Sequence, residues 1–183
     1  MRALGLILLA TVTVGTPAAL AGQDTAAAAT SAMSRRDYQL TMLEHQRAFL
    51  LKMADSMPER LYREKATPEQ RDFAQQIHHA AGAVPFITSR VLKGPALSLP
   101  DTATALNSRE GLRQFINASY DYGATLLKDQ SDSVRTAEVN LFGNTMPAWQ
   151  VWDELHAHTI WTAGQVVANF RENGMAPPAF TFF

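Results

Sequence analysis

Apolar residues recur at alternating three- and four-residue spacing in four separate stretches of this 183-residue chain. The repeat is clearest in the second stretch, at Phe73, Ile77, Ala80, Val84, Ile87 and Val91. This spacing places side chains on one face of an α-helix, whereas strands alternate every two residues. Little of the sequence alternates in that way, so the pattern predicts an all-α fold.

Proline and capping residues set the ends of the first two predicted helices. The first spans residues 37–57 and ends before Pro58, which lacks the N–H that a helix interior needs. The second begins at Pro68, with Thr67 as its N-cap and Gln70 completing a capping box.

The last two helices have equally local signals. The third is capped at Asn107 or Ser108, and the fourth spans residues 146–171. Asn173-Gly174 is a typical helix end, and Pro177-Pro178 prevents the helix from resuming.

Four amphipathic helices of roughly 20 residues, each roughly 30 Å long, predict a four-helix bundle. The connection over residues 92–107 is long enough to cross one end of the bundle, so a long crossover is expected in place of simple up-down-up-down order. Residues 140–144 form an irregular stretch, and Leu141 and Phe142 within it are expected to fold back as a lid.

The first 21 residues have the three zones of a secretory signal. Basic Arg2 is followed by an apolar run over residues 4–14 and by small residues that end at Ala21. We therefore expect a signal peptide over 1–21, a flexible leader over 22–34, a bundle domain over 35–178 and a tail over 179–183. The mature protein is expected to be periplasmic or secreted.

Composition excludes several classes of function. The chain has no cysteine, which removes disulfides, thiolate metal sites and cysteine nucleophiles. The formal net charge is −1 and the basic residues are scattered, so nucleic-acid binding is not expected. No segment after the signal is long and apolar enough to span a membrane.

Histidines are the best candidate ligands in the absence of cysteine. His79 lies on the small-residue flank of the apolar face of the second helix, and His158 lies on the inner flank of the fourth, so the two can converge. His45 lies on the apolar side of the first helix, while neighbouring Glu44 is less well placed. His156 is two residues from His158 and points away from it.

Two groups of short motifs carry a resemblance to a known family. The chain contains Met57-Pro58-Glu59, Tyr62, residues 67–73 and residues 76–83, and later His158, Gly164-Gln165 and residues 171–178. These resemble the opening and closing signatures of DinB-like proteins. The resemblance covers residues 35–178.

The resemblance implies a four-helix bundle that often binds a divalent metal through three histidines. One ligand lies on the second helix and two lie one turn apart on the fourth. Residue by residue, the first two ligands fall on His79 and His158, and the third falls on Thr162. The chain therefore agrees with the family in its scaffold and departs from it at the site.

A neutral threonine hydroxyl is a poor replacement for imidazole, because nickel and zinc prefer nitrogen donors at such sites. His45 is the best candidate for a replacement third ligand. Two other interpretations stay open. In the first, His79 and His158 are partly buried polar residues that bind no metal. In the second, Thr162 is a core-facing residue whose hydroxyl bonds to the backbone carbonyl one turn earlier.

Two classes of function follow from the resemblance. One is a metal-dependent hydrolase or a thiol-dependent transferase with bound nickel or zinc. The other, which we favour, is an exported, non-catalytic bundle with a degenerate or altered three-histidine site. Its small-molecule ligand is unknown, and a homodimer through exposed helix faces is left open.

Overall fold

A computed structural model describes residues 32–181 of the chain. The predicted signal peptide, and the predicted leader up to residue 31, lie outside the described residues. The chain becomes helical at Arg35, where the sequence predicted the start of the domain. Ser34 caps this helix, since its hydroxyl accepts a hydrogen bond from the Asp37 N–H at 3.1 Å.

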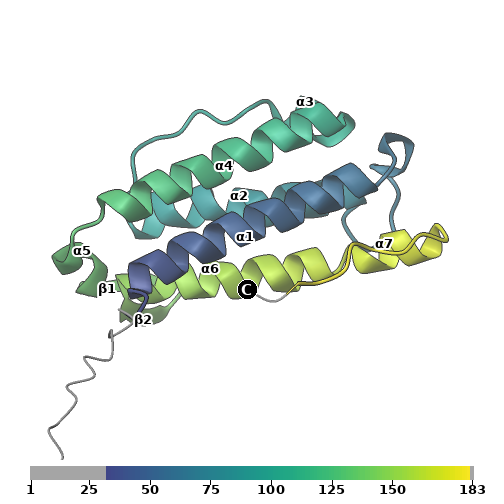
Figure 1. The fold of residues 1–183 in the computed structure, drawn as a ribbon. Coiled ribbons are helices and arrows are strands. Elements are labelled where there is room, and N and C mark those ends of the chain that lie inside the picture. Colours follow the sequence, from purple (N-terminus) through teal and green to yellow (C-terminus); the bar gives the residue numbers. More distant parts are fainter. Residues whose placement is uncertain (1–31, 182–183) are drawn as a thin grey trace, which may run out of the picture. The chain divides into compact units, whose positions relative to one another are not determined.

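The described part of the chain is largely helical, with one small hairpin. The elements are α1 (Arg35–Ser56), the 3-10 helix η1 (Glu59–Leu61), α2 (Phe73–Val91), α3 (Thr102–Asn107), α4 (Arg109–Asp129), α5 (Asp132–Thr136), β1 (Glu138–Leu141), β2 (Asn144–Pro147), α6 (Ala148–Gly164) and α7 (Val167–Glu172). Figure 1 shows the four long helices α1, α2, α4 and α6 lying side by side. The predicted all-α class and four-helix bundle are confirmed.

The helices are connected with one long crossover. Helix α4 packs along both α1 and α2, and α6 packs along the same two helices. Figure 1 shows that α2 and α4 run in the same direction, with the chain after α2 returning along the bundle to α3. The Tyr122 hydroxyl holds this return, because it donates to the Pro95 carbonyl at 2.8 Å. Parallel neighbours need such a connection, so the predicted crossover is confirmed.

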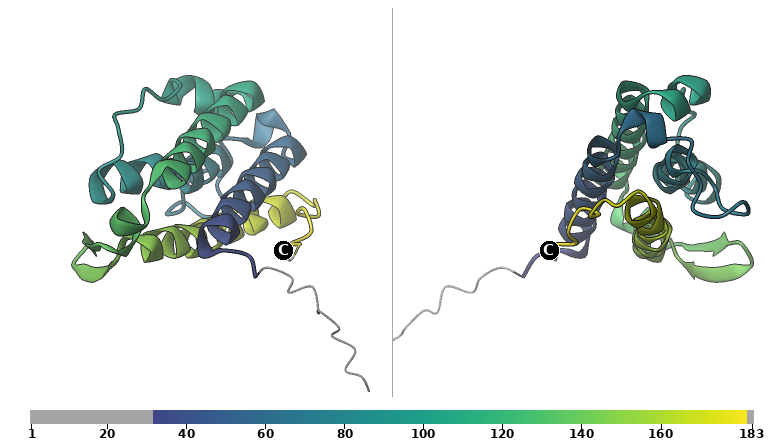
Figure 2. Two further views of the ribbon diagram at one scale, coloured as in Figure 1. Left: turned by 60° about the vertical axis from the view of Figure 1, so that its left-hand side comes forward. Right: turned by 90° about the vertical axis from the view of Figure 1, so that its right-hand side faces the viewer.

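The core is formed mainly by side chains of the four long helices, whose arrangement Figure 2 shows in two further views. The largest side chains that are almost wholly buried are Tyr62, Tyr120, Phe73, Phe170, Leu50, Met53, Met57, Ile77, Leu112, Ile116, Leu127 and Leu155. Tyr62 keeps its hydroxyl satisfied by donating to the Ala54 carbonyl at 2.8 Å. Among the described residues, no helix has the length and apolar character needed to cross a bilayer.

The predicted start of the second helix is wrong by more than one turn. Residues 67–70 form a turn instead, in which the Gln70 N–H donates to the Thr67 carbonyl at 3.1 Å. The capping box is formed by Asp72 and Gln75, with hydrogen bonds of 2.8 and 3.1 Å. Asp72 is 2% exposed and pairs with Arg63 at 2.8 Å, so tertiary contacts hold this cap in place.

The predicted fourth helix is also shorter than expected. Helix α6 ends at Gly164, and α7 begins only at Val167. The predicted stop after α7 is confirmed, because Gly174 has φ +67° and the Met175 N–H donates to the Phe170 carbonyl at 2.9 Å. These are the features of a Schellman motif.

The residues predicted to be an irregular lid form a β-hairpin. Strands β1 and β2 pair antiparallel, with Leu141 opposite Asn144. The two-residue turn has positive φ at Phe142 (49°) and Gly143 (96°), as a type I′ turn requires. Leu141 is buried, but Phe142 is 72% exposed, so only Leu141 folds back into the core.

Candidate functional site

His79 and His158 lie face to edge between α2 and α6. Their ring centroids are 5.2 Å apart and their planes are inclined at 71°. One turn before His79, the Gln76 side chain donates to the Thr162 carbonyl at 3.2 Å and to Gln165 Oε1 at 3.1 Å. These bonds fix α2 against α6 at this level, so the two imidazoles meet as the sequence predicted.

Thr162 lies beside this pair with its side chain turned into the bundle. It is 2% exposed, which agrees with the core-facing interpretation. Its Oγ1 lies 3.4 Å from His158 Nε2, and this contact replaces the predicted bond to a backbone carbonyl. The position to which the sequence resemblance assigned a third ligand therefore holds a hydroxyl that is already paired with one of the two histidines.

His45 does not join the other two histidines. It lines a separate small pocket with Phe49, Lys52 and Ala179, and its charge acts on His156. Within residues 32–181, no group of three or more His, Cys, Asp or Glu side chains is placed to bind a metal. The predicted rescue of the site by His45 thus has no geometric support, because α1 presents His45 to a different face of α6.

The two histidines open onto a largely apolar pocket of about 360 Å³. Its walls are His78, His79, Gly82, Ala83, Phe86, Ile87, Phe142 and His158. Phe142 comes from the tip of the β-hairpin, so the lid prediction holds in a weaker form: Phe142 borders the pocket but does not close it. A pocket of this size and lining suits a small apolar molecule.

Burial and a nearby arginine both favour the neutral form of the two imidazoles. Burial lowers the pKa of His79 first, and the positive charge of Arg71 lowers that pKa further. The pKa of His158 is lowered by the same two causes in the same order. Neutral imidazole has a free nitrogen lone pair, which is the form that binds a metal. The charge of Arg71, however, opposes any cation at this place.

The spacing of the two rings fits a shared ion. Metal–nitrogen bonds of about 2.0–2.1 Å place the centroids of two coordinated imidazoles roughly 5 Å apart in a tetrahedral site. The observed separation is 5.2 Å. His158 Nδ1 is also buried and has no hydrogen-bond partner within the described part of the chain. The same separation is usual for two aromatic rings packed edge to face, whose centroids lie about 4.5–7 Å apart.

His78 is a third pocket residue that sequence reasoning missed. Only one of the adjacent pair His78 and His79 was expected at a shared site, since adjacent helical residues diverge by about 100°. His78 instead stacks on Phe115, with ring centroids 3.8 Å apart. Its Nε2 is buried with no hydrogen-bond partner among the described residues. A Cβ at Gly82, one turn later, would make only an ordinary contact with Phe115 at 3.4 Å, so no glycine signal in the sequence marks this stacking.

Comparisons with known proteins add a fold to this geometry. No family model matches the sequence, and no curated protein matches it. Among solved structures, the chain is similar to the crystal structure of a DinB-like protein from Bacillus cereus ATCC 10987. The TM-score is 0.63 at 20% sequence identity, and the match covers 78% of this chain and 95% of that one. The chain therefore has the fold of a DinB-like protein.

Proposed function

We propose that this chain is an exported DinB-fold protein that binds a divalent ion, nickel or zinc, through His79 and His158 alone. The observation that carries the proposal is the position of two neutral imidazoles at the wall of an apolar pocket. Their ring centroids are 5.2 Å apart. Each supplies a nitrogen donor of the kind these ions prefer.

The proposed site is an altered form of the three-histidine arrangement. Thr162 offers a hydroxyl already paired with His158, and the Arg71 charge acts on both ligands. Binding is therefore expected to be weaker than in a site with three imidazoles, and two or more coordination positions remain for exchangeable ligands. We favour a binding role without catalysis for this reason.

A metal-dependent hydrolase or thiol-dependent transferase is the second candidate. The 360 Å³ pocket beside the histidines favours it, because a substrate has room next to the open coordination positions. A bound ion would acidify a water or a thiol there. Turnover of ester or thiol-acceptor substrates that disappears on chelation would support the enzyme over the binding protein.

Calorimetric titration of the purified chain with Ni²⁺ and Zn²⁺, combined with elemental analysis, tests the metal site. We expect one ion per chain, lost in His79→Ala and in His158→Ala. His45→Ala is the matched control, since it removes a histidine from another pocket and should leave binding unchanged. A native chain that takes up neither ion would favour the interpretation of His79 and His158 as polar packing residues.

Export rests on the basic, apolar and small-residue zones of residues 1–21. Mass spectrometry of protein recovered from the periplasm or medium is expected to give an N-terminus at Gly22. Full-length protein confined to the cytoplasm would contradict export. Two further predictions remain: the protein does not bind nucleic acid, and a homodimer through exposed helix faces is left open.

A further inference from the structure

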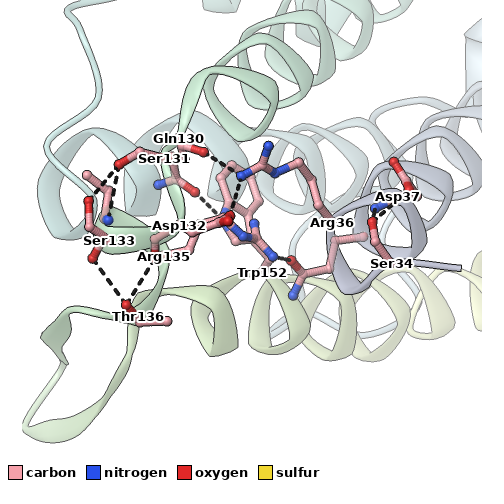
Figure 3. Close-up of polar contacts among 12 residues, drawn as sticks. Ser34, Arg36, Asp37, Gln130, Ser131, Asp132, Ser133, Arg135, Thr136 and Trp152 are labelled. Atoms are coloured by element: carbon pink, nitrogen blue, oxygen red, sulfur yellow. Dashed lines mark hydrogen bonds and ion pairs between the residues drawn. The ribbon is translucent and has the colours of Figure 1, made fainter.

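Three arginines line a second pocket at the start of α1. Arg35, Arg36 and Arg135 border a space of about 620 Å³ between α1 and α5. This arginine pocket shares no lining residue with the histidine pocket. Figure 3 shows the Arg36 side chain reaching from α1 toward Asp132, with Arg135 beside it. None of these residues belongs to a motif of the sequence.

Arg135 is a buried cation with unused hydrogen-bonding capacity. It is only 6% exposed. Its Nη2 donates to Gln39 Oε1 at 2.8 Å, but its Nη1 is buried without a hydrogen-bond partner among residues 32–181. Buried polar groups are nearly always paired, and an unpaired charged donor is destabilising.

Arg36 presents a second unused donor in the same pocket. Its Nη2 donates to the Gln130 carbonyl at 2.7 Å and to Asp132 Oδ1 at 2.9 Å. Its Nε is buried and has no partner in the described part of the chain. The Asp132 side chain is 96% exposed, so water screens its charge and weakens its ability to neutralise two guanidinium groups.

Neighbouring residues hold the two guanidinium groups in place. Gln39, which accepts from Arg135, itself donates to the Trp149 carbonyl and to Asp153 Oδ1, each at 2.7 Å. Arg35 stacks on the Trp149 ring at 3.9 Å from its centroid. Because these contacts exist without a ligand, little ordering is needed on binding.

The local field also favours an anion. Burial lowers the pKa of Arg135, and the nearby positive charge of Arg36 lowers it further. The positive end of the 22-residue helix α1 lies at the same pocket, since Ser34 and Asp37 line it. Asp37 and Asp132 at the rim limit the net charge, so a small anion fits better than a polyanion.

We propose that the arginine pocket binds the carboxylate or phosphate group of a small molecule, with the Arg36 and Arg135 guanidinium groups as its donors. Guanidinium groups suit both oxyanions, because their N–H groups match the spacing of two oxygens. The indole of Trp149 forms an apolar wall for the rest of the ligand.

Calorimetric titration of the purified full-length chain with inorganic phosphate and, separately, with benzoate tests the proposal. Saturable binding of phosphate assigns the site to phosphoryl ligands, and saturable binding of benzoate assigns it to carboxylates. We expect Arg135→Gln and Arg36→Gln each to weaken that binding about tenfold or more, the loss typical of one charge-assisted hydrogen bond. Arg60→Gln is the control, since Arg60 is exposed in η1 and its loss removes the same charge.

Two results would overturn the proposal. One is the absence of saturable binding of either probe to the native chain at about 10 mM, the weak end of useful affinity. The other is equal weakening in Arg60→Gln, which would show a response to net charge alone. Circular dichroism checks that each variant is folded. If Arg135→Gln is unfolded, the titrations of the native chain and of Arg36→Gln test the proposal without it.

Discussion

The histidine pocket and the arginine pocket both contain buried nitrogen groups, but burial affects the charge of these groups differently. Burial lowers the pKa values of His79 and His158, so these side chains lose their charge and become acceptors or metal ligands. Arg135 is also buried, and burial lowers its pKa too, but a guanidinium group stays protonated near neutral pH. A buried histidine avoids the penalty of an unpaired charge by neutralising itself, whereas a buried arginine must find an acceptor.

This difference predicts opposite ligands for the two pockets. The neutral imidazoles have lone pairs to offer a cation, and the guanidinium groups have only hydrogens to offer an anion. The following variants test whether the two pockets really differ in this way.

Thr162→His is expected to have the largest effect. A third imidazole one turn after His158 would complete a three-nitrogen site and raise the affinity for Ni²⁺ or Zn²⁺ by roughly 100-fold, about 2.7 kcal/mol. Calorimetric titration measures the change. Thr162→Val is the control, because it removes the hydroxyl without adding a ligand. Equal affinity in a folded Thr162→His protein would mean that the two histidines do not point at a shared ion.

Buried glutamines in the two regions should differ in their importance for stability. Gln39→Leu removes the acceptor of the Arg135 guanidinium, and we expect a loss of about 2–3 kcal/mol in the free energy of unfolding. Gln76→Leu breaks neutral hydrogen bonds to Thr162 and Gln165, with an expected loss of about 1 kcal/mol. Urea denaturation measures both values. If Gln76→Leu lost more unfolding free energy than Gln39→Leu, the unpaired charge of Arg135 would not be the main cause of destabilisation.

Stability should depend on pH through the histidine pocket. Because the pKa of His158 is lower in the folded chain than in the unfolded one, the unfolded state binds more protons just below pH 6.5. The stabilisation is therefore present above that pH and is lost as the pH falls toward the folded value.

Urea denaturation between pH 7.5 and pH 5, with chelator present, would measure this dependence. We expect a shallower decline in His158→Gln than in the native chain. Arg135→Gln should decline as the native chain does, because arginine does not titrate in this range. Identical slopes for the native chain and His158→Gln would contradict the assignment of a neutral buried imidazole.

Phe142→Asn is expected to have the smallest effect. Asparagine tolerates the positive φ of 49° at this turn position better than phenylalanine, so stability should rise by about 0.5 kcal/mol. The change also removes an aromatic wall from the histidine pocket and should leave oxyanion binding in the arginine pocket unaltered. Thermal unfolding, with the phosphate and benzoate titrations as control, tests both parts.

Much of the fold was readable from local sequence. The helix faces of α1, α2 and α4 follow from their apolar repeats, and the Gly174 stop follows from the need for positive φ. The hairpin was missed because Phe142-Gly143 is an unusual pair for a type I′ turn, which asparagine or aspartate with glycine usually forms. The start of α2 was misplaced because two capping boxes compete in the sequence, and only contact with Arg63 decides between them.

The candidate sites were predicted only in part. His79 and His158 were expected to converge because each lies on the inner flank of an amphipathic helix, and the structure brings them together. His45 met the same criterion and lies elsewhere, since a helical pattern gives the direction of a side chain within its own helix but not the partner it faces.

The interpretation of Thr162 as the place of a third histidine came from the resemblance to DinB-like proteins. The sequence by itself determined four amphipathic helices and placed His79 and His158 on their inner flanks. Those features depend on periodicity and residue type, which are properties of short segments. Only the tertiary structure decided that His45 lies apart, that Phe142 borders the pocket, and that Arg36 and Arg135 share a space with unused donors. Arg36 and Arg135 are about a hundred positions apart in the chain, and their meeting depends on how α1 and α5 pack.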